Sequence, residues 1–410
     1  MSLRVANARG APTIGITLLL ASLSMISPLS IDTFLPSLPT IALQFHLSAW
    51  QAQQIITAYL VPFALFSLVH GPLSDALGRR RVVLGGLALY STGSVGCFLA
   101  PGFGLLLVCR VLQGTAAGIG STVARAVVRD LYDGANAQKL MSSIMLVFSL
   151  APAVAPVLGG WLHVTFGWRS VFGLLLLVGL TLMTLCALLL PETHPRSKRT
   201  TFHPVALLRS CWHVASGPAY LLLAISAALS IAALFVYIGA TPAIILDRWH
   251  LRETQFYYVF IPVVAGFMVA SFVGGRLAGR LPRARQLAMG FGLLFISAVG
   301  SLAAHGASSR APIPLVQCLL FCMALGVQLT LPILSLEMLD MHPQARGAAA
   351  SVQAFMTLGV GAIMMGMVAP VLHGNLLLLA WIALASAVLA WLAWRGGCTL
   401  RERPRPAERA

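Results

Sequence analysis

Long stretches without Asp, Glu, Lys or Arg are the feature that most restricts how this chain can fold. A helix needs about 20 mainly apolar residues to cross a bilayer. The charge-free runs that can hold at least one such helix are 10–31, 33–74, 82–109, 140–168, 170–191, 210–246, 254–275, 286–309, 311–336 and 347–394. Only 9% of the 410 residues are charged, whereas soluble domains carry roughly 25%. The sequence therefore predicts an all-α integral membrane protein.

Twelve membrane-spanning helices are expected, because two of the runs are double length and one further helix carries a single internal charge at Arg110. The predicted spans are 13–36, 52–73, 81–101, 103–126, 139–163, 168–191, 215–240, 254–277, 284–305, 311–336, 346–372 and 375–395. Only one segment between spans is long enough to separate two halves of six helices. The expected divisions are 1–191 as an N-terminal six-helix bundle, 192–214 as a cytoplasmic central loop, 215–395 as a C-terminal six-helix bundle and 396–410 as a basic cytoplasmic tail.

The net charge of +16 has to be explained before a function is considered. When loops are assigned alternately to two sides of the membrane, 22 of the 27 basic residues fall on one side. Cytoplasmic loops of membrane proteins carry an excess of Lys and Arg. The basicity therefore predicts topology, with both termini cytoplasmic in a bacterial-type inner membrane, and a nucleic-acid partner is not expected.

Motifs for enzymatic chemistry are missing from the sequence. It contains no HExxH, no G-x-S-x-G and no Gly-rich phosphate loop of the form G-x-x-x-x-G-K-[ST]. The ten histidines are scattered, and the seven cysteines form no CxxC pair, so neither a metal site nor a cofactor is expected. Without a nucleotide-binding motif, an ion gradient would have to drive any transport. A sensor or scaffold would not need the intramembrane charges of Asp32 and Arg110.

Residues 71–81, GPLSDALGRRR, resemble the signature loop between the second and third helices of the major facilitator superfamily. A weaker copy begins at Gly275, at the equivalent place in the second half. Gly71 would allow close backbone approach, and Asp75 can pair with a basic side chain. The resemblance implies a latch that closes the inward side, with Arg129 as a partner of Asp75. The residues assigned to this latch are Gly71, Asp75, Gly78, Arg79, Arg80 and Arg129. The alternative is a basic turn that only fixes topology.

The fourth helix contains LLVCRVLQG, residues 106–114, which resembles the intramembrane Arg motif of the same superfamily. A charge at the bilayer centre costs about 2.5–3.5 kcal/mol on insertion scales, so Arg110 should face the bundle interior and find an acceptor. Gln113 lies on the same helix face, and Gly114 permits close helix approach. The resemblance implies a role in ion coupling for Arg110 and Gln113; a merely structural polar contact is the alternative.

The fifth helix contains APAVAPVLGG, residues 151–160, which resembles the antiporter motif of drug exporters. Pro152 and Pro156 should bend the helix, while Gly159 and Gly160 should pack against a neighbour. Alanines stand at 151 and 155, where the broader family usually has glycine, and this substituted form resembles the Bcr/CflA branch. An ordinary proline-kinked helix is the alternative interpretation.

The first helix ends in IDTFLPSLP, residues 31–39, and the sixth in LPET, residues 190–193; both again resemble the Bcr/CflA branch. Asp32 is the only acid in the first seventy residues and lies among apolar neighbours. We interpret it as the site of protonation linked to transport, with an exposed loop cap as the alternative. The resemblance implies a monomeric exporter of small, drug-like molecules by proton-coupled antiport with alternating access. Proton- or sodium-coupled uptake of a small metabolite is the rival function on the same fold.

Three aromatic residues are candidates for lining a substrate cavity between the two bundles: Tyr59, Phe235 and Tyr237. Anchoring at the membrane interface or contact with lipid would explain each of them equally well.

Overall fold

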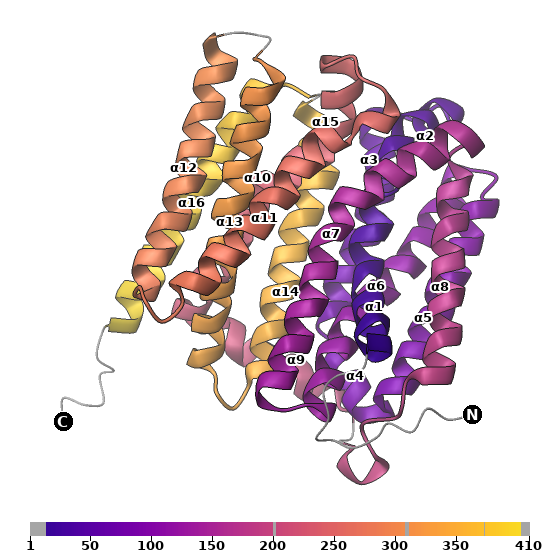
Figure 1. Ribbon diagram of the computed structural model, residues 1–410, viewed down its shortest axis with the longest axis vertical. Helices are drawn as coiled ribbons and strands as arrows, with labels where there is room; N and C mark the ends of the chain where they lie inside the picture. Colours follow the sequence, from indigo (N-terminus) through magenta and orange to yellow (C-terminus); the bar gives the residue numbers. More distant parts are fainter. Residues whose placement is uncertain (1–13, 200–201, 308–310, 373, 403–410) are drawn as a thin grey trace. The chain divides into compact units, whose positions relative to one another are not determined.

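A computed structural model describes residues 14–199, 202–307, 311–372 and 374–402. Every regular element in these ranges is helical, and the chain divides into two compact units (Figure 1). Unit 1 comprises residues 1–203 and 241–260, and unit 2 comprises residues 204–240 and 261–410. The N-terminal 13 residues and most of the predicted basic tail, from 403 onward, lie outside the described residues.

Unit 1 contains the predicted first six spans. Its helices are α1 (Ile14–Asp32), η1 (Leu35–Ser37), α2 (Leu38–Gln44), α3 (Ala49–Ser67), α4 (His70–Leu77), α5 (Arg79–Leu99), α6 (Phe103–Leu131), α7 (Gly134–Phe166), α8 (Arg169–Leu189) and η2 (Arg196–Lys198), together with a π-helix η3 (Ala243–Arg248) and η4 (Glu253–Gln255). The packing thus groups Thr241–Phe260 with the first half of the chain, whereas the sequence-based division places that segment in the second bundle.

Unit 2 contains most of each remaining span, although the last residues of α10 and the first residues of α11 group with unit 1. Its helices are α9 (Pro204–Ala215), α10 (Pro218–Pro242), α11 (Tyr257–Leu277), α12 (Arg283–Ala307), α13 (Ile313–Met341), α14 (Arg346–Ile363), the π-helix η5 (Met364–Val368), α15 (Ala369–Leu372) and α16 (Leu376–Glu402). The segment predicted as a central loop therefore includes a helix of its own, α9, which packs on α14. Helix α16 also continues to Glu402, beyond the predicted span, because charged residues end an apolar run without ending a helix.

The prediction of twelve spans is confirmed. Eleven helices in the described residues are long and apolar enough to cross a membrane, and α3 with α4 forms a twelfth span if the bent pair is counted as one. The two helices meet at 56°. Pro72 has no N–H to donate to the carbonyl of Leu68, so the helical hydrogen bonding breaks at this point.

Many large apolar side chains are exposed on the outside of the helices, as expected for a protein surrounded by lipid rather than by water. Leu188, Phe272 and Val164 are 74%, 62% and 60% exposed. Inside each unit, short polar side chains connect helices: the hydroxyl of Ser27 donates to the carbonyl of Ala117 at 2.7 Å, and that of Tyr220 donates to the carbonyl of Ala349 at 2.6 Å. Such bonds stabilise helix pairs where no hydrophobic effect acts between them.

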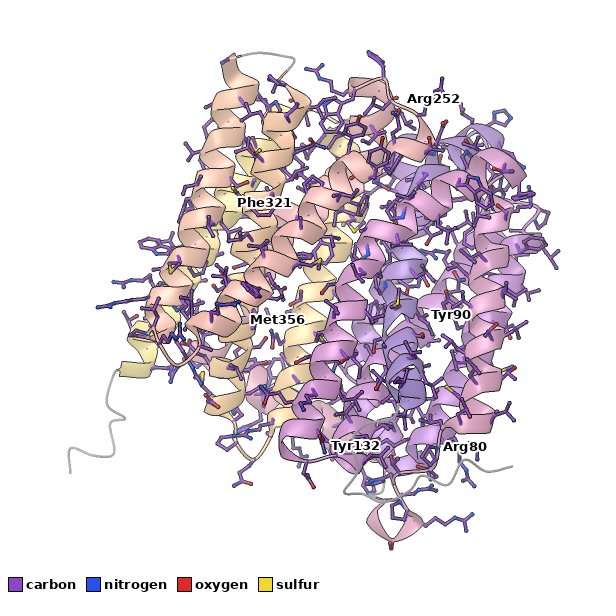
Figure 2. The ribbon with its side chains drawn as sticks, viewed as in Figure 1. Arg80, Tyr90, Tyr132, Arg252, Phe321 and Met356 are labelled. Atoms are coloured by element: carbon purple, nitrogen blue, oxygen red, sulfur yellow. The ribbon has the colours of Figure 1, made fainter. Side chains whose placement is uncertain are left out.

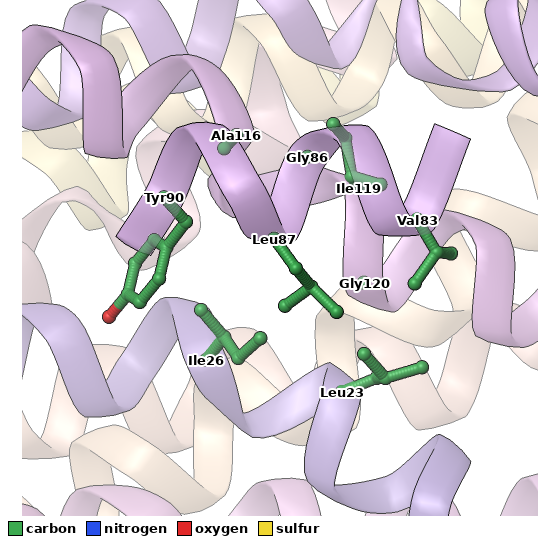
Figure 3. Close-up of a pocket in the computed structure, with 9 residues that line it drawn as sticks. All are labelled: Leu23, Ile26, Val83, Gly86, Leu87, Tyr90, Ala116, Ile119 and Gly120. Atoms are coloured by element: carbon green, nitrogen blue, oxygen red, sulfur yellow. The ribbon is translucent and has the colours of Figure 1, made fainter. Parts of the chain in front are cut away.

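Helices α1, α5 and α6 pack closely in the centre of unit 1. Figure 3 shows Leu23 and Ile26 of α1 facing Leu87 of α5 around a cavity of about 10 Å³. A space of this size is at the lower limit for one water molecule. Glycines permit the close contacts: a Cβ on Gly120 of α6 would collide with the carbonyl of Leu23.

Gly114 provides a test of this packing. A Cβ at this position would collide with the backbone carbonyl of Tyr59, where α6 approaches α3. We expect Gly114→Ala to lower the free energy of unfolding by about 1–3 kcal/mol, the usual cost of overpacking. Gly85→Ala is the matched control, because a Cβ on Gly85 meets no atom within 4 Å, and alanine there should stabilise the helix by up to about 1 kcal/mol. Thermal unfolding of the purified variants in detergent measures both; equal stability of the two variants would contradict the prediction.

Candidate functional site

Arg110 is the most deeply buried charged residue of unit 1, with an exposed fraction of 0%. Its Nε donates to the carbonyl of Ile55 in α3 at 3.2 Å. Its Nη1 donates to the carbonyl of Ser30 in α1 at 3.3 Å and to Oε1 of Gln113 at 3.0 Å. All these acceptors are neutral, and Nη2 is buried without a partner among the described residues. Arg110 thus faces the interior, as predicted, but no acid within the described ranges forms an ion pair with it.

Two aromatic rings complete the surroundings of the Arg110 guanidinium. Its central carbon lies 4.4 Å from the ring centre of Tyr59 and 5.2 Å from that of Phe34. The Tyr59 hydroxyl donates to the carbonyl of Ser27 at 3.3 Å, and the residue is 0% exposed. Tyr59 was one of the candidates for lining a substrate cavity, with interface anchoring or lipid contact as the alternatives. The structure instead packs it inside unit 1, because its ring covers a buried cation.

Gln113 connects Arg110 to α5. Its Nε2 donates to the Oγ of Ser94 at 2.8 Å, while its Oε1 accepts from Arg110. On the neighbouring side, the hydroxyls of Ser30 and Tyr90 lie 2.5 Å apart. The Ser30 hydroxyl donates its one hydrogen to the carbonyl of Ile26 in its own helix. In the hydrogen bond between the two hydroxyls, Tyr90 is therefore the donor and Ser30 the acceptor. Figure 2 labels Tyr90 on its helix within unit 1. Sequence reasoning missed Ser30, Tyr90 and Ser94, which have no spacing signature.

Asp32 is the last residue of α1, a few residues before the end of the predicted span 13–36, and is only 6% exposed. Its carboxyl forms no hydrogen bond and no ion pair within the described part of the chain. The loop-cap alternative required an exposed side chain, and the burial argues against it. Asp32 and Arg110 belong to one network of helices, since Phe34, two residues after Asp32, contacts the guanidinium.

The helix-five motif lies where α7 meets the end of α1. A Cβ on Gly159 would collide with the carbonyl of Thr33, and one on Gly160 with the carbonyl of Glu253 in η4. The prediction that this glycine pair packs against a neighbour is therefore confirmed. Pro152 and Pro156 lie inside the uninterrupted helix α7.

The signature loop holds a cluster of charges around Arg79, the first residue of α5. Its guanidinium forms an ion pair with Asp75, donates to the Oδ2 of Asp130 at 3.2 Å and donates to the Oγ of Ser74 at 2.6 Å. The sequence suggested Arg129 as the partner of Asp75. In this structure Arg79 takes that place, because it lies one helical turn after Asp75 and is 8% exposed.

The LPET segment after α8 closes over this cluster. Glu192 accepts the backbone N–H of Arg79 at 2.9 Å, which caps the start of α5. The Thr193 hydroxyl donates to the Oδ2 of Asp130 at 2.8 Å. Neither contact could be read from the sequence, since the residues lie 113 and 63 positions apart.

Gly78 and Gly71 of the signature loop differ in how strongly the structure favours glycine at their positions. Gly78 has φ 101°, a backbone conformation that L side chains rarely adopt, so glycine is strongly favoured there. Gly71 lies in α4, and its nearest neighbour, Thr122 Cγ2, would be 4.0 Å from an added Cβ. The close approach expected at Gly71 is therefore wrong for this structure. Arg80 follows at the same end of unit 1 (Figure 2).

Unit 2 contains a counterpart of this cluster. Arg283, the first residue of α12, pairs with Asp340 in the last turn of α13 at 2.9 Å. Arg79 and Asp130 make the same connection between the start of α5 and the end of α6. Arg283 is also the residue that the internal sequence repeat aligns with Arg79. The repeat thus extends to a matching ion pair in each unit.

The two candidate cavity residues of unit 2 lie on α10. Tyr237 is 2% exposed, and Phe235 is half-buried against Gly361 of α14, whose added Cβ would lie 3.0 Å from the ring. No group of three or more His, Cys, Asp or Glu side chains suited to a metal ion occurs within the described ranges.

Comparison with solved structures supports the fold. The chain resembles the human organic anion transporter MFSD10 (TETRAN) with a TM-score of 0.68 over 94% of this chain and 99% of that protein, at 18% sequence identity. At this identity, the likeness concerns the fold alone.

Comparison with curated proteins shows relatives among bacterial transporters. An uncharacterized MFS-type transporter, YdgK of Bacillus subtilis, is 32% identical over 67% of this chain and 68% of its own length. The bicyclomycin resistance protein homolog of Haemophilus influenzae is 29% identical over 86% and 88%. The multidrug resistance protein MdtL of Escherichia coli is 28% identical over 69% and 71%. The family model of the Major Facilitator Superfamily matches residues 20–366. On these matches and the twelve-span fold, the chain belongs to the Major Facilitator Superfamily of multi-pass membrane transporters.

Proposed function

We propose that this transporter exports small, drug-like molecules by proton-coupled antiport with alternating access. Relatives named for bicyclomycin resistance and multidrug resistance support a drug-like substrate. The helix-five motif, residues 151–160, favours export through its resemblance to the antiporter motif of drug exporters.

The observation that carries the proposal is the buried carboxyl of Asp32, which has no hydrogen-bond or ion-pair partner in the described part of the chain. A carboxyl held away from water favours its neutral form, and a change in its surroundings can release the proton. Intramembrane acids of this kind mark proton pathways in transporters. Asp32 is therefore the proposed proton carrier.

Arg110 would couple the charge of Asp32 to the helices of unit 1. Among the described residues it has no acidic partner and its Nη2 is unsatisfied, so a carboxylate on Asp32 would attract it. Its three bonded neighbours belong to α1, α3 and α6. A shift of the guanidinium toward a deprotonated Asp32 would move these helices together.

The cluster around Arg79 would act as the latch between states. Asp75 is 44% exposed, and exposed ion pairs contribute only about 0–1 kcal/mol to stability. Such a pair can break and re-form during each cycle. The pairing of Asp75 with Arg129, predicted from the family motif, stays a prediction for another conformation.

Arg110→Lys tests whether charge alone is sufficient. Lysine keeps the charge but cannot donate in the fork that reaches Ile55, Ser30 and Gln113 together. We expect at least a tenfold loss of coupled transport, whereas Arg285→Lys, an exposed control, should transport normally. Energised efflux from cells with matched expression measures both. Wild-type efflux by Arg110→Lys would show that the geometry of the guanidinium is not required.

Asp75→Asn tests the latch. The substitution removes a partly exposed ion pair, so stability should change by less than about 1 kcal/mol. We expect slower turnover with substrate affinity close to that of the wild type, because a latch controls exchange between states rather than the binding site. Transport rates in proteoliposomes and ligand binding in detergent separate the two effects. Unchanged transport kinetics would remove Asp75 from the latch.

Asp32→Asn tests proton coupling itself. Asparagine is close to isosteric with the neutral acid, so the protein should insert and fold normally. We expect proton-driven transport of a neutral substrate to be abolished in proteoliposomes with an imposed pH gradient. Asp133→Asn is the matched control, because Asp133 is exposed. Substrate-induced proton movement is the readout, and its sign relative to substrate flux also distinguishes antiport from uptake. Wild-type coupling in Asp32→Asn would overturn the proposal.

A further inference from the structure

A cavity of about 380 Å³ lies beside the start of α5, apart from the proposed coupling site. It is open to solvent and is bordered by the start of α5 on one side and by the segment that follows α8 on the other. The charged residues that line it are Arg80, Arg81, Arg196, Arg199 and Glu192. Four guanidinium groups thus face one carboxylate.

The single carboxylate does not neutralise the cavity. Glu192 already accepts the backbone N–H groups of Arg79 and His194, at 2.9 and 3.1 Å, and its other oxygen lies 3.5 Å from Arg199. The Nη2 of Arg80 donates to the carbonyl of Ala187, while its Nε is buried without a partner among the described residues. The cavity therefore keeps an excess of positive charge and an unsatisfied donor.

A phosphate group matches this donor set. Guanidinium groups bind phosphate oxygens through paired N–H donors, and the bonds are charge-assisted. The cavity also borders the N-terminus of α5, a helix of 21 residues whose dipole favours an anion. Three features of the cavity favour an anion: the excess positive charge, the unpaired Nε of Arg80 and the helix terminus.

The surroundings of the cavity favour a lipid as the source of this phosphate. Leu84, one turn into α5, contributes apolar surface to the cavity wall. Ala187, whose carbonyl binds Arg80, is followed by Leu188, a residue that is 74% exposed on the outside of α8. The charged lining thus passes into an apolar surface, as the boundary between a headgroup and its acyl chains would require.

We propose that this cavity binds the phosphate of an anionic phospholipid headgroup. The bound phosphate would hold Arg196 and Arg199 beside Arg80 and Arg81, and so fix the segment after α8 on the signature loop. That segment touches the proposed latch directly, since Glu192 caps Arg79 and Thr193 binds Asp130. The lipid would therefore stabilise the closed arrangement of the Arg79 cluster.

The test uses the full-length protein purified in neutral detergent, with phosphatidylglycerol or phosphatidylcholine added. Native mass spectrometry measures bound lipid, and thermal unfolding measures stabilisation. We expect phosphatidylglycerol to bind at least tenfold more tightly than phosphatidylcholine to the wild-type protein. Arg196→Gln should reduce this preference severalfold, and Arg196→Gln with Arg199→Gln should abolish it. Arg196 is exposed, so the single variant should fold even if the double variant does not.

The matched control is Arg280→Gln with Arg285→Gln, two exposed arginines in the corresponding loop of unit 2 and in the first turn of α12. It should keep the full preference for phosphatidylglycerol. Equal preference in Arg196→Gln and in the wild type would overturn the proposal, as would an equal loss in the control. Inorganic phosphate provides a third arm. If phosphate alone stabilises the protein as much as phosphatidylglycerol does, and the lipid adds nothing, the cavity takes a free anion and the lipid assignment fails.

Discussion

The buried guanidinium of Arg110 is the constraint on which the centre of unit 1 depends. An isolated charge at the bilayer centre costs about 2.5–3.5 kcal/mol on insertion scales, and that cost falls only if neighbours supply acceptors. Carbonyls of α1 and α3, the amide of Gln113 and two aromatic rings supply them. These groups belong to α1, α3, α6 and the turn that follows α1, so the cation fixes how these segments pack. Its Nη2 has no partner among the described residues.

A second cation, Arg79, organises the end of unit 1 in a different way. It lies at a helix terminus, and its partners Asp75 and Asp130 are partly exposed. Water competes for such pairs, so they can exchange at little cost in stability. Arg283 and Asp340 repeat the arrangement in unit 2. Each unit therefore combines a rigid apolar bundle with a weak polar connection between the start of one helix and the end of the next.

The sequence predicted those features of the site that follow from the chemistry of a single residue type. Arg110 had to face inward because lipid cannot solvate it, and Gly159 and Gly160 had to meet a neighbour because small residues permit close packing. The prediction of a close backbone approach at Gly71 was wrong because a glycine in a motif does not by itself bring another segment close. The packing of the neighbouring segments decides whether any atom approaches it. The pairing of Arg79 with Asp130 and the capping by Glu192 join residues far apart in the chain, and no periodicity reports such contacts.

The sequence by itself determined the membrane class and the number of spans, because hydropathy acts on each segment separately and a helix satisfies its own backbone in lipid. The tertiary structure alone decided which polar groups meet. It buried Asp32 with no partner among the described residues, placed Tyr59 against Arg110, and brought Arg196 and Arg199 beside Arg80. These outcomes depend on how helices turn and pack against one another, and that information is distributed over the whole chain rather than held in any one motif.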